Sequence, residues 1–104
     1  MTTITKEELK EKLDNDEVIL VDVLSEESYE RSHIKGAVNI PYKIIGTKAK
    51  EKFGKDDRIV VSCSGPGCQA SHTAAEKLED LGFNNIYHYK GGKKEWEEAG
   101  YPME

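Results

Sequence analysis

Near its middle the chain reads Arg58-Ile59-Val60-Val61-Ser62-Cys63-Ser64-Gly65-Pro66-Gly67-Cys68-Gln69-Ala70-Ser71, an apolar run that leads into a loop of small residues. A continuous apolar run of this kind is typical of a strand that is covered on both faces, as in parallel sheets. Beyond the loop, Ala74, Leu78 and Leu81 recur at helical spacing, and Gly82 follows them as a C-cap signal. The segment therefore predicts a strand, a loop and a helix in succession, which is the repeating unit of an α/β sheet.

The same alternation of strands and helices extends to both ends of the chain. Further strands are expected at Val18–Val23, Gly36–Pro41 and Asn85–Tyr89. Further helices are expected at 5–13, at 25–31 and around Trp96 after Gly91-Gly92, and a weak helical pattern covers 42–53. Thr5 and Glu8 form a capping box at the start of the first of these helices. The chain has 104 residues and contains no linker or repeat, so we expect one domain over residues 1–104. The expected fold class is α/β with a mainly parallel sheet.

Composition and charge exclude several classes of partner. The chain is 37% hydrophobic and 34% charged, and its net charge is −5 with acidic and basic residues mixed along its length. Binding to nucleic acid needs a basic face that displaces counterions, so no nucleic acid partner is expected. No apolar run is long enough to span a bilayer and the first residues lack the layout of a signal peptide, so we expect no membrane contact and a cytoplasmic location. Since no large exposed apolar seam is indicated, a monomer is expected.

Cys63 is the candidate nucleophile, because it follows a buried strand and opens the loop that leads into the helix. Open α/β sheets place their reactive groups at the carboxyl ends of strands. The glycines of the loop allow backbone amides to converge, and the following helix directs its free N–H groups and positive dipole end toward the same region. These features stabilise a thiolate. The plainer alternative, a small buried hydrophobe, gives the loop no purpose, and we favour the nucleophile.

Cys68 is the second of two cysteines, and two interpretations of it remain open. It is either a resolving thiol that attacks an oxidised or sulfurated Cys63, or a loop thiol without a role. A zinc site made of Cys63, Cys68 and His72 is disfavoured, because structural zinc needs a fourth ligand that is not apparent, and we expect no metal and no cofactor. Cysteine phosphatase chemistry is also disfavoured, since its loop needs arginine six positions after the nucleophile, where this chain has Gln69.

Two further segments, taken together with the Cys63 loop, resemble the rhodanese (sulfurtransferase) family over nearly the whole chain. Val18–Val23, followed by Tyr29-Glu30 and His33–Pro41, looks like the amino-terminal signature of that family. Leu81-Gly82-Phe83, followed by Gly91–Trp96 and Gly100-Tyr101-Pro102, looks like its carboxyl-terminal signature. The resemblance implies a single rhodanese-like domain with a five-stranded, mainly parallel sheet that is flanked by helices on both faces.

The resemblance also implies a sulfurtransferase in which Cys63 accepts sulfane sulfur as a persulfide and passes it to a thiophilic acceptor, a form of covalent catalysis. The backbone of the loop would bind the donor, through Ser64, Gly65, Pro66, Gly67, Cys68 and Gln69. The implied partners are a small sulfur-donor anion or low-molecular-weight persulfide, and a sulfur-accepting protein. Asp22 and His33 match signature positions but are expected to tie a strand end to a loop and to order a turn.

The chain departs from the family in its arginines. Leu24 stands where many single-domain members carry arginine, and the loop resembles a subset with Cys-x-Gly-Pro-x-Cys rather than one with Cys-x-x-Gly-x-Arg. This departure disfavours efficient use of thiosulfate and leaves room for a persulfide on a small thiol or a protein. Lys93 and Lys94 are expected on a solvated face, with steering of anions as the alternative.

Three remaining side chains are expected to have structural roles, and three functions are still possible for the Cys63 loop. Trp96 is expected in the core or the pocket wall, His72 at an exposed helix position and His88 on a strand surface. A sulfurtransferase predicts cyanide-labile sulfur on Cys63, and a thiol redox protein predicts a Cys63–Cys68 disulfide after mild oxidation. A non-catalytic binding module predicts an unreactive Cys63.

Overall fold

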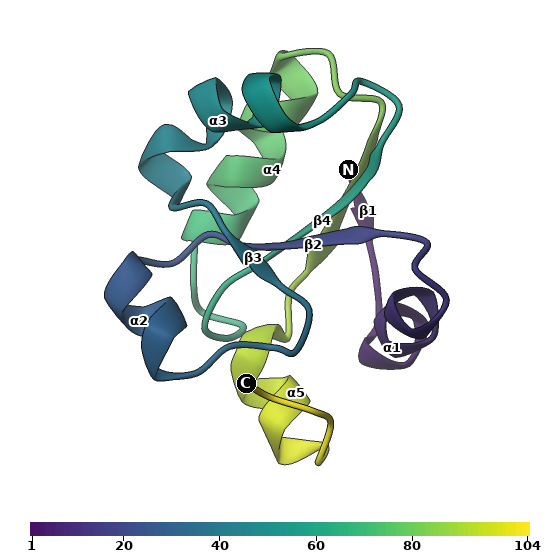
Figure 1. Cartoon of the computed structure of the whole chain (residues 1–104), viewed down its shortest axis with the longest axis vertical. Coiled ribbons are helices and arrows are strands. Elements are labelled where there is room, and N and C mark those ends of the chain that lie inside the picture. Colours follow the sequence, from purple (N-terminus) through teal and green to yellow (C-terminus); the bar gives the residue numbers. More distant parts are fainter.

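The computed structural model describes all 104 residues. Its strands are β1 (Thr2–Thr3), β2 (Ile19–Asp22), β3 (Val38–Asn39), β4 (Arg58–Ser62) and β5 (Asn85–Tyr89). Its helices are α1 (Lys6–Asp14), α2 (Glu26–Arg31), α3 (Ile45–Lys52), α4 (Ala70–Asp80) and α5 (Gly92–Glu98), and a 3₁₀ turn η1 (Tyr42–Ile44) precedes α3. The strands form one sheet in the order β1-β5-β4-β2-β3, and every neighbouring pair is parallel (Figure 1). The expected five-stranded α/β fold is confirmed.

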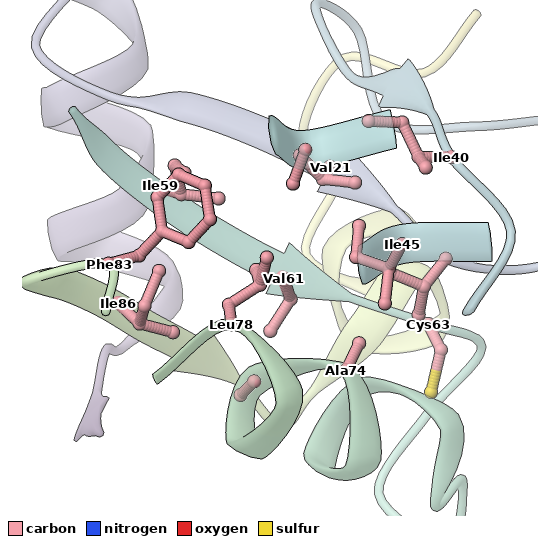
Figure 2. Packing of buried hydrophobic residues seen from close by; sticks show 13 residues of the cluster. Val21, Ile40, Ile45, Ile59, Val61, Cys63, Ala74, Leu78, Phe83 and Ile86 are labelled. Atoms are coloured by element: carbon pink, nitrogen blue, oxygen red, sulfur yellow. The ribbon is translucent and has the colours of Figure 1, made fainter. Parts of the chain in front are cut away.

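Two hydrophobic clusters, one on each face of the sheet, hold the helices in place. Because side chains alternate along a strand, Ile59 and Val61 of β4 point toward α3 and α4, while Val60 points toward α1 and α5. Figure 2 shows the first of these clusters, which contains 13 buried residues. The apolar run in β4 is therefore continuous because both faces of this strand are covered.

Local signals place the helix ends where the sequence predicts them. The capping box of α1 is formed, since the Thr5 hydroxyl accepts from the Glu8 amide at 3.2 Å and the Glu8 carboxylate accepts from the Thr5 amide at 3.1 Å. At the end of α4, Gly82 has a φ of +93°. Its N–H donates to the Glu79 carbonyl at 2.9 Å and the Phe83 N–H donates to the Leu78 carbonyl at 3.1 Å, which is a Schellman motif.

One strand lies outside the sequence predictions. Strand β1 consists of two exposed threonines that pair with Tyr87 and His88 of β5. It contributes backbone hydrogen bonds rather than buried side chains, so no apolar pattern marks it. No helix of this fold is both long and apolar enough to cross a membrane.

Candidate active site

The loop at the carboxyl end of β4 begins with Cys63, which is 2% exposed and packs between the sheet and α4 (Figure 2). Its sulfur is bonded to that of Cys68 in a disulfide, with the two Cα atoms 6.4 Å apart. The structure is therefore the oxidised form of the loop. Cys63 becomes a thiol or thiolate only when this bond is reduced.

The first turn of α5 fixes the backbone of the Cys63 loop. The Lys93 N–H donates to the Cys63 carbonyl at 3.0 Å, and the Lys94 N–H donates to the Ser64 carbonyl at 3.0 Å. No side chain caps α5, so these two loop carbonyls take the place of an N-cap. The C=O and N–H groups of a trans peptide point in opposite directions, so the N–H groups of Ser64 and Gly65 point away from α5.

Gly92 allows this close approach between α5 and the loop. Its φ is +64°, and a Cβ atom at this position would lie 2.6 Å from both the Cys63 carbonyl oxygen and the Gly65 nitrogen. Only glycine fits both the backbone torsion and the contact. Within the loop itself, the Cys68 N–H already donates to the Gly65 carbonyl at 3.1 Å.

The start of α4 brings two further polar groups to Cys63. The Ser71 hydroxyl oxygen lies 3.3 Å from the Cys63 sulfur and 2.7 Å from Nε2 of His88. Ser71 is 1% exposed and His88 is 5% exposed, so the prediction of His88 as a strand-surface residue is wrong. The physical reason is that His88 shares the face of β5 with Ile86, and α4 covers that face.

The surroundings of the His88 imidazole disfavour its charged form. Burial lowers its pKa from the ordinary value near 6.5, and the nearby His72 and Lys90 lower it further. Ser71 was not among the predicted site residues, although it occupies the apolar stripe of α4 with Ala74, Ala75 and Leu78. A serine in such a stripe signals a buried hydroxyl that needs a partner.

A shallow pocket of about 240 Å³ opens beside the disulfide, lined by Pro66, Cys68, Gln69, His72, His88 and Lys90. The His72 ring lies 6.0 Å from that of His88, and its Nε2 is 3.3 Å from the Glu76 carboxylate. His72 is exposed, as the sequence predicts. No group of three or more His, Cys, Asp or Glu side chains is arranged to hold a metal ion.

Asp22 and His33 have the structural roles that the sequence predicts. The Asp22 carboxylate accepts from the Leu24 N–H at 2.9 Å just beyond β2, and burial raises the pKa of this carboxyl group. His33 stacks on the Tyr29 ring at 3.7 Å, and its Nδ1 lies 2.8 Å from the Tyr29 carbonyl. Neither side chain is hydrogen-bonded to Cys63.

Three residues of α5 have different surroundings. Trp96 is 2% exposed and donates from Nε1 to the Pro102 carbonyl at 2.9 Å, so it belongs to the core. Lys93 is half-buried, and its ammonium group donates to the carbonyls of Ser28 and Ser32 at 3.2 and 3.0 Å, so the expected solvated position is wrong for this residue. Lys94 is exposed as predicted, and its side chain runs along Gly65 of the loop.

A cysteine at the end of a parallel strand, in a loop held between two helices, defines a thiol-based site on an α/β sheet. The chain belongs to the rhodanese-like domain family, whose sequence profile matches residues 5–99. It is 37% identical to the mouse thiosulfate sulfurtransferase/rhodanese-like domain-containing protein 3 over 89% of this chain and 66% of that protein. It is 30% identical to the thiosulfate sulfurtransferase GlpE of Actinobacillus succinogenes over 99% of this chain and 90% of that protein.

Some relatives carry the matching region within longer proteins. An HTH-type transcriptional regulator of Mycobacterium tuberculosis is 36% identical over 97% of this chain, which spans 44% of that protein. Across three of the curated relatives that it matches, the chain spans between 44% and 66% of their length. Among solved structures, the BH2092 protein of Bacillus halodurans superposes with a TM-score of 0.91 at 28% identity, covering 99% of this chain and 76% of that one.

Proposed function

We propose that the chain is a sulfurtransferase that moves sulfane sulfur from a donor to a thiophilic acceptor through a persulfide on Cys63. The observation that carries the proposal is the position of Cys63 at the carboxyl end of β4, against the first turn of α4. There the positive end of the α4 dipole favours a thiolate over a thiol. Relatives named thiosulfate sulfurtransferase, among them GlpE, support the same class of reaction.

The proposed reaction consists of two displacements at sulfur. In the first, the reduced Cys63 thiolate attacks the outer sulfur of the donor, a Cys63–sulfur bond forms, and the donor leaves as a thiolate or as sulfite. In the second, an acceptor thiolate attacks the same outer sulfur, and the Cys63 thiolate departs. The N–H groups of Ser64 and Gly65 are free of α5 and are the proposed binding groups for the negative charge.

The direct test is the mass of the reduced protein after incubation with thiosulfate or glutathione persulfide. We expect a gain of one sulfur atom, which cyanide removes as thiocyanate. A reduced protein that gains no sulfur from either donor would contradict the proposal. If Cys63 also stayed unlabelled by iodoacetamide near neutral pH, the chain would be better described as a non-catalytic binding module.

Lysines rather than arginines are the proposed source of positive charge for an anionic donor. Lys90 lines the pocket with Cys68, and the side chain of Lys94 runs along Gly65. We expect Lys90→Gln and Lys94→Gln each to lower kcat/KM for thiosulfate by up to about fivefold, since exposed charge pairs contribute about 0.2–1 kcal/mol. The effect should shrink at high salt because exposed charges are screened.

The matched control for these lysines is Lys52→Gln. Lys52 is exposed at the end of α3, toward the amino end of β4 and away from Cys63. This variant removes the same charge and should leave kcat/KM for thiosulfate unchanged. Equal losses in all three variants would mean that only net charge matters, and would contradict local binding by Lys90 and Lys94.

A second candidate function is reduction of sulfane sulfur to sulfide, and the Cys63–Cys68 disulfide favours it. In this reaction the Cys68 thiolate attacks the inner sulfur of the Cys63 persulfide, the disulfide forms, and hydrosulfide leaves. A dithiol reductant then restores both thiols. With dithiothreitol and excess glutathione persulfide, the wild-type chain should release sulfide in many turnovers, and Cys68→Ser should accept sulfur without this turnover.

A further inference from the structure

The buried pair Ser71 and His88 has no part in the two displacements, yet it is joined to the reacting sulfur. The Ser71 hydroxyl oxygen bridges the Cys63 sulfur, at 3.3 Å, and Nε2 of His88, at 2.7 Å. The residues come from three different elements, namely the end of β4, the first turn of α4 and β5. When the disulfide is reduced and Cys63 carries a proton, these contacts would form a line of exchangeable protons from the sulfur to the imidazole.

We propose that Ser71 and His88 form a proton relay that takes the thiol proton of reduced Cys63 and so generates the nucleophilic thiolate. The proposal rests on the proposed role of Cys63 and adds two positioning residues to that site. A relay would also give the thiol proton a path to solvent, because Cys63 is 2% exposed in the closed loop and has little direct contact with water. A buried thiol needs such a route for its proton.

The relay has an exit at its far end. His88 lines the pocket beside Cys68, where water has access. Every buried side-chain nitrogen and oxygen of the chain has a hydrogen-bond partner. The only side-chain hydrogen bond of His88 is made by its Nε2, so its Nδ1 has no partner. Its Nδ1 is therefore not buried, and it is the atom that exchanges protons with the pocket.

The proposed proton transfer is balanced within the three side chains. The S–H bond of Cys63 breaks and its proton passes to the Ser71 oxygen, while the Ser71 hydroxyl proton passes to Nε2 of His88. The electron pair stays on sulfur, so a neutral thiol and imidazole become a thiolate and an imidazolium. The 2.7 Å separation of Ser71 and His88 is within the range for a general base.

The charges around His88 set its affinity for the proton. His72 of α4, itself beside Glu76, and Lys90 beyond β5 face the imidazole and lower its pKa. The neighbouring strands place the uncharged Thr3 and Val61 opposite His88. A thiolate at the far end of the relay would raise this pKa, because a nearby negative charge favours the imidazolium.

Two lysines of α5 contact the Cys63 loop. Lys93 and Lys94 bind the loop through their backbone amides, and the ammonium group of Lys93 is held by carbonyls at the end of α2. Both lysines remain in every variant of the test below. Their effect on the thiolate is therefore the same in each arm of the comparison.

The test uses reduced protein in a Cys68→Ser background, so that Cys63 is the only thiol. The rate of alkylation by iodoacetamide is measured against pH for this parent and with Ser71→Ala, Ser71→Thr or His88→Gln added. We expect Ser71→Ala and His88→Gln to slow alkylation near neutral pH by about tenfold, the factor for loss of one hydrogen bond to a charged group. Ser71→Thr keeps the hydroxyl and should restore part of the rate. His72→Gln removes a charge that lowers the pKa of His88, so it should not slow alkylation.

A spectroscopic readout separates a relay from a merely structural contact. The pKa of the His88 imidazole, followed by nuclear magnetic resonance, should be higher in the parent than in the Cys63→Ser/Cys68→Ser protein, and Ser71→Ala should abolish this difference. The proposal is overturned if the alkylation profiles of Ser71→Ala and His88→Gln superimpose on that of the parent, or if the imidazole titrates identically with and without Cys63. If Ser71→Ala does not fold, His88→Gln and the imidazole titration decide. Neither readout uses a sulfur donor, so failure of sulfur transfer would not be mistaken for failure of the relay.

Discussion

A Cys68→Ser variant is expected to accumulate the Cys63 persulfide, and a Cys63→Ser variant is expected to take up no cyanide-labile sulfur at all. The reason for the first effect is that Cys68 is the one thiol of the chain that reaches Cys63. Without it the persulfide persists until an external acceptor arrives. The reason for the second is that a serine hydroxyl does not become an anion near neutral pH, so the first displacement cannot begin. Intact mass before and after cyanide treatment measures both effects.

The two variants serve as controls for each other, because each keeps one cysteine of the loop and loses the disulfide. Any general effect of losing the disulfide on folding is therefore common to both, and the double variant removes both thiols. Cyanide-labile sulfur on Cys68 of the Cys63→Ser protein would show that the nucleophile has been assigned to the wrong residue. If the persulfide decays equally fast in Cys68→Ser and in the wild type, Cys68 takes no part in the reaction.

Gly92→Ala is expected to cost about 2–5 kcal/mol of stability, the sum of a left-handed backbone for an L-residue and the overpacking of a close contact. The new methyl group would lie 2.6 Å from two backbone atoms of the loop, the Cys63 oxygen and the Gly65 nitrogen. Backbone atoms cannot rotate away, so α5 and the loop must separate. Denaturant unfolding measures the loss of stability, and the yield of persulfide measures the damage to the site.

Gly100→Ala is the matched control for this substitution. Gly100 also has a positive φ, +77°, but nothing lies within 4 Å of where its Cβ would be. It should lose only the backbone contribution of about 1–2 kcal/mol and retain sulfur uptake. Equal effects of the two substitutions would show that the contact between α5 and the loop contributes nothing beyond backbone conformation.

The fold was predictable because its determining signals are local. The apolar run in β4 marks a strand covered on both faces, and Thr5 with Glu8 marks the start of α1. These signals depend on neighbours in sequence, and the structure has the elements where they predict them. Strand β1 was missed because Thr2 and Thr3 join the sheet only through their backbones.

The site was predictable only where it is continuous in sequence. Cys63, Cys68 and the start of α4 lie on one segment, whereas His88 and Gly92 reach the loop from β5 and α5 through tertiary packing. The burial of His88 could have been inferred from its place two residues after Ile86, on the same face of β5, provided that both faces of this strand were taken as covered. Its contact with Ser71 depends on how α4 is rotated about its axis, which helical spacing alone does not give.

The capping of α5 by the Cys63 and Ser64 carbonyls couples two motions that are usually independent. When the loop opens, the Lys93 and Lys94 amides lose their acceptors, so the helix frays at the same moment. Hydrogen exchange at these two amides therefore reports the opening of a loop that lies some thirty positions earlier in the chain. Comparing their exchange rates in the oxidised, reduced and persulfidated protein would give the free energy of loop opening in each state of the sulfur.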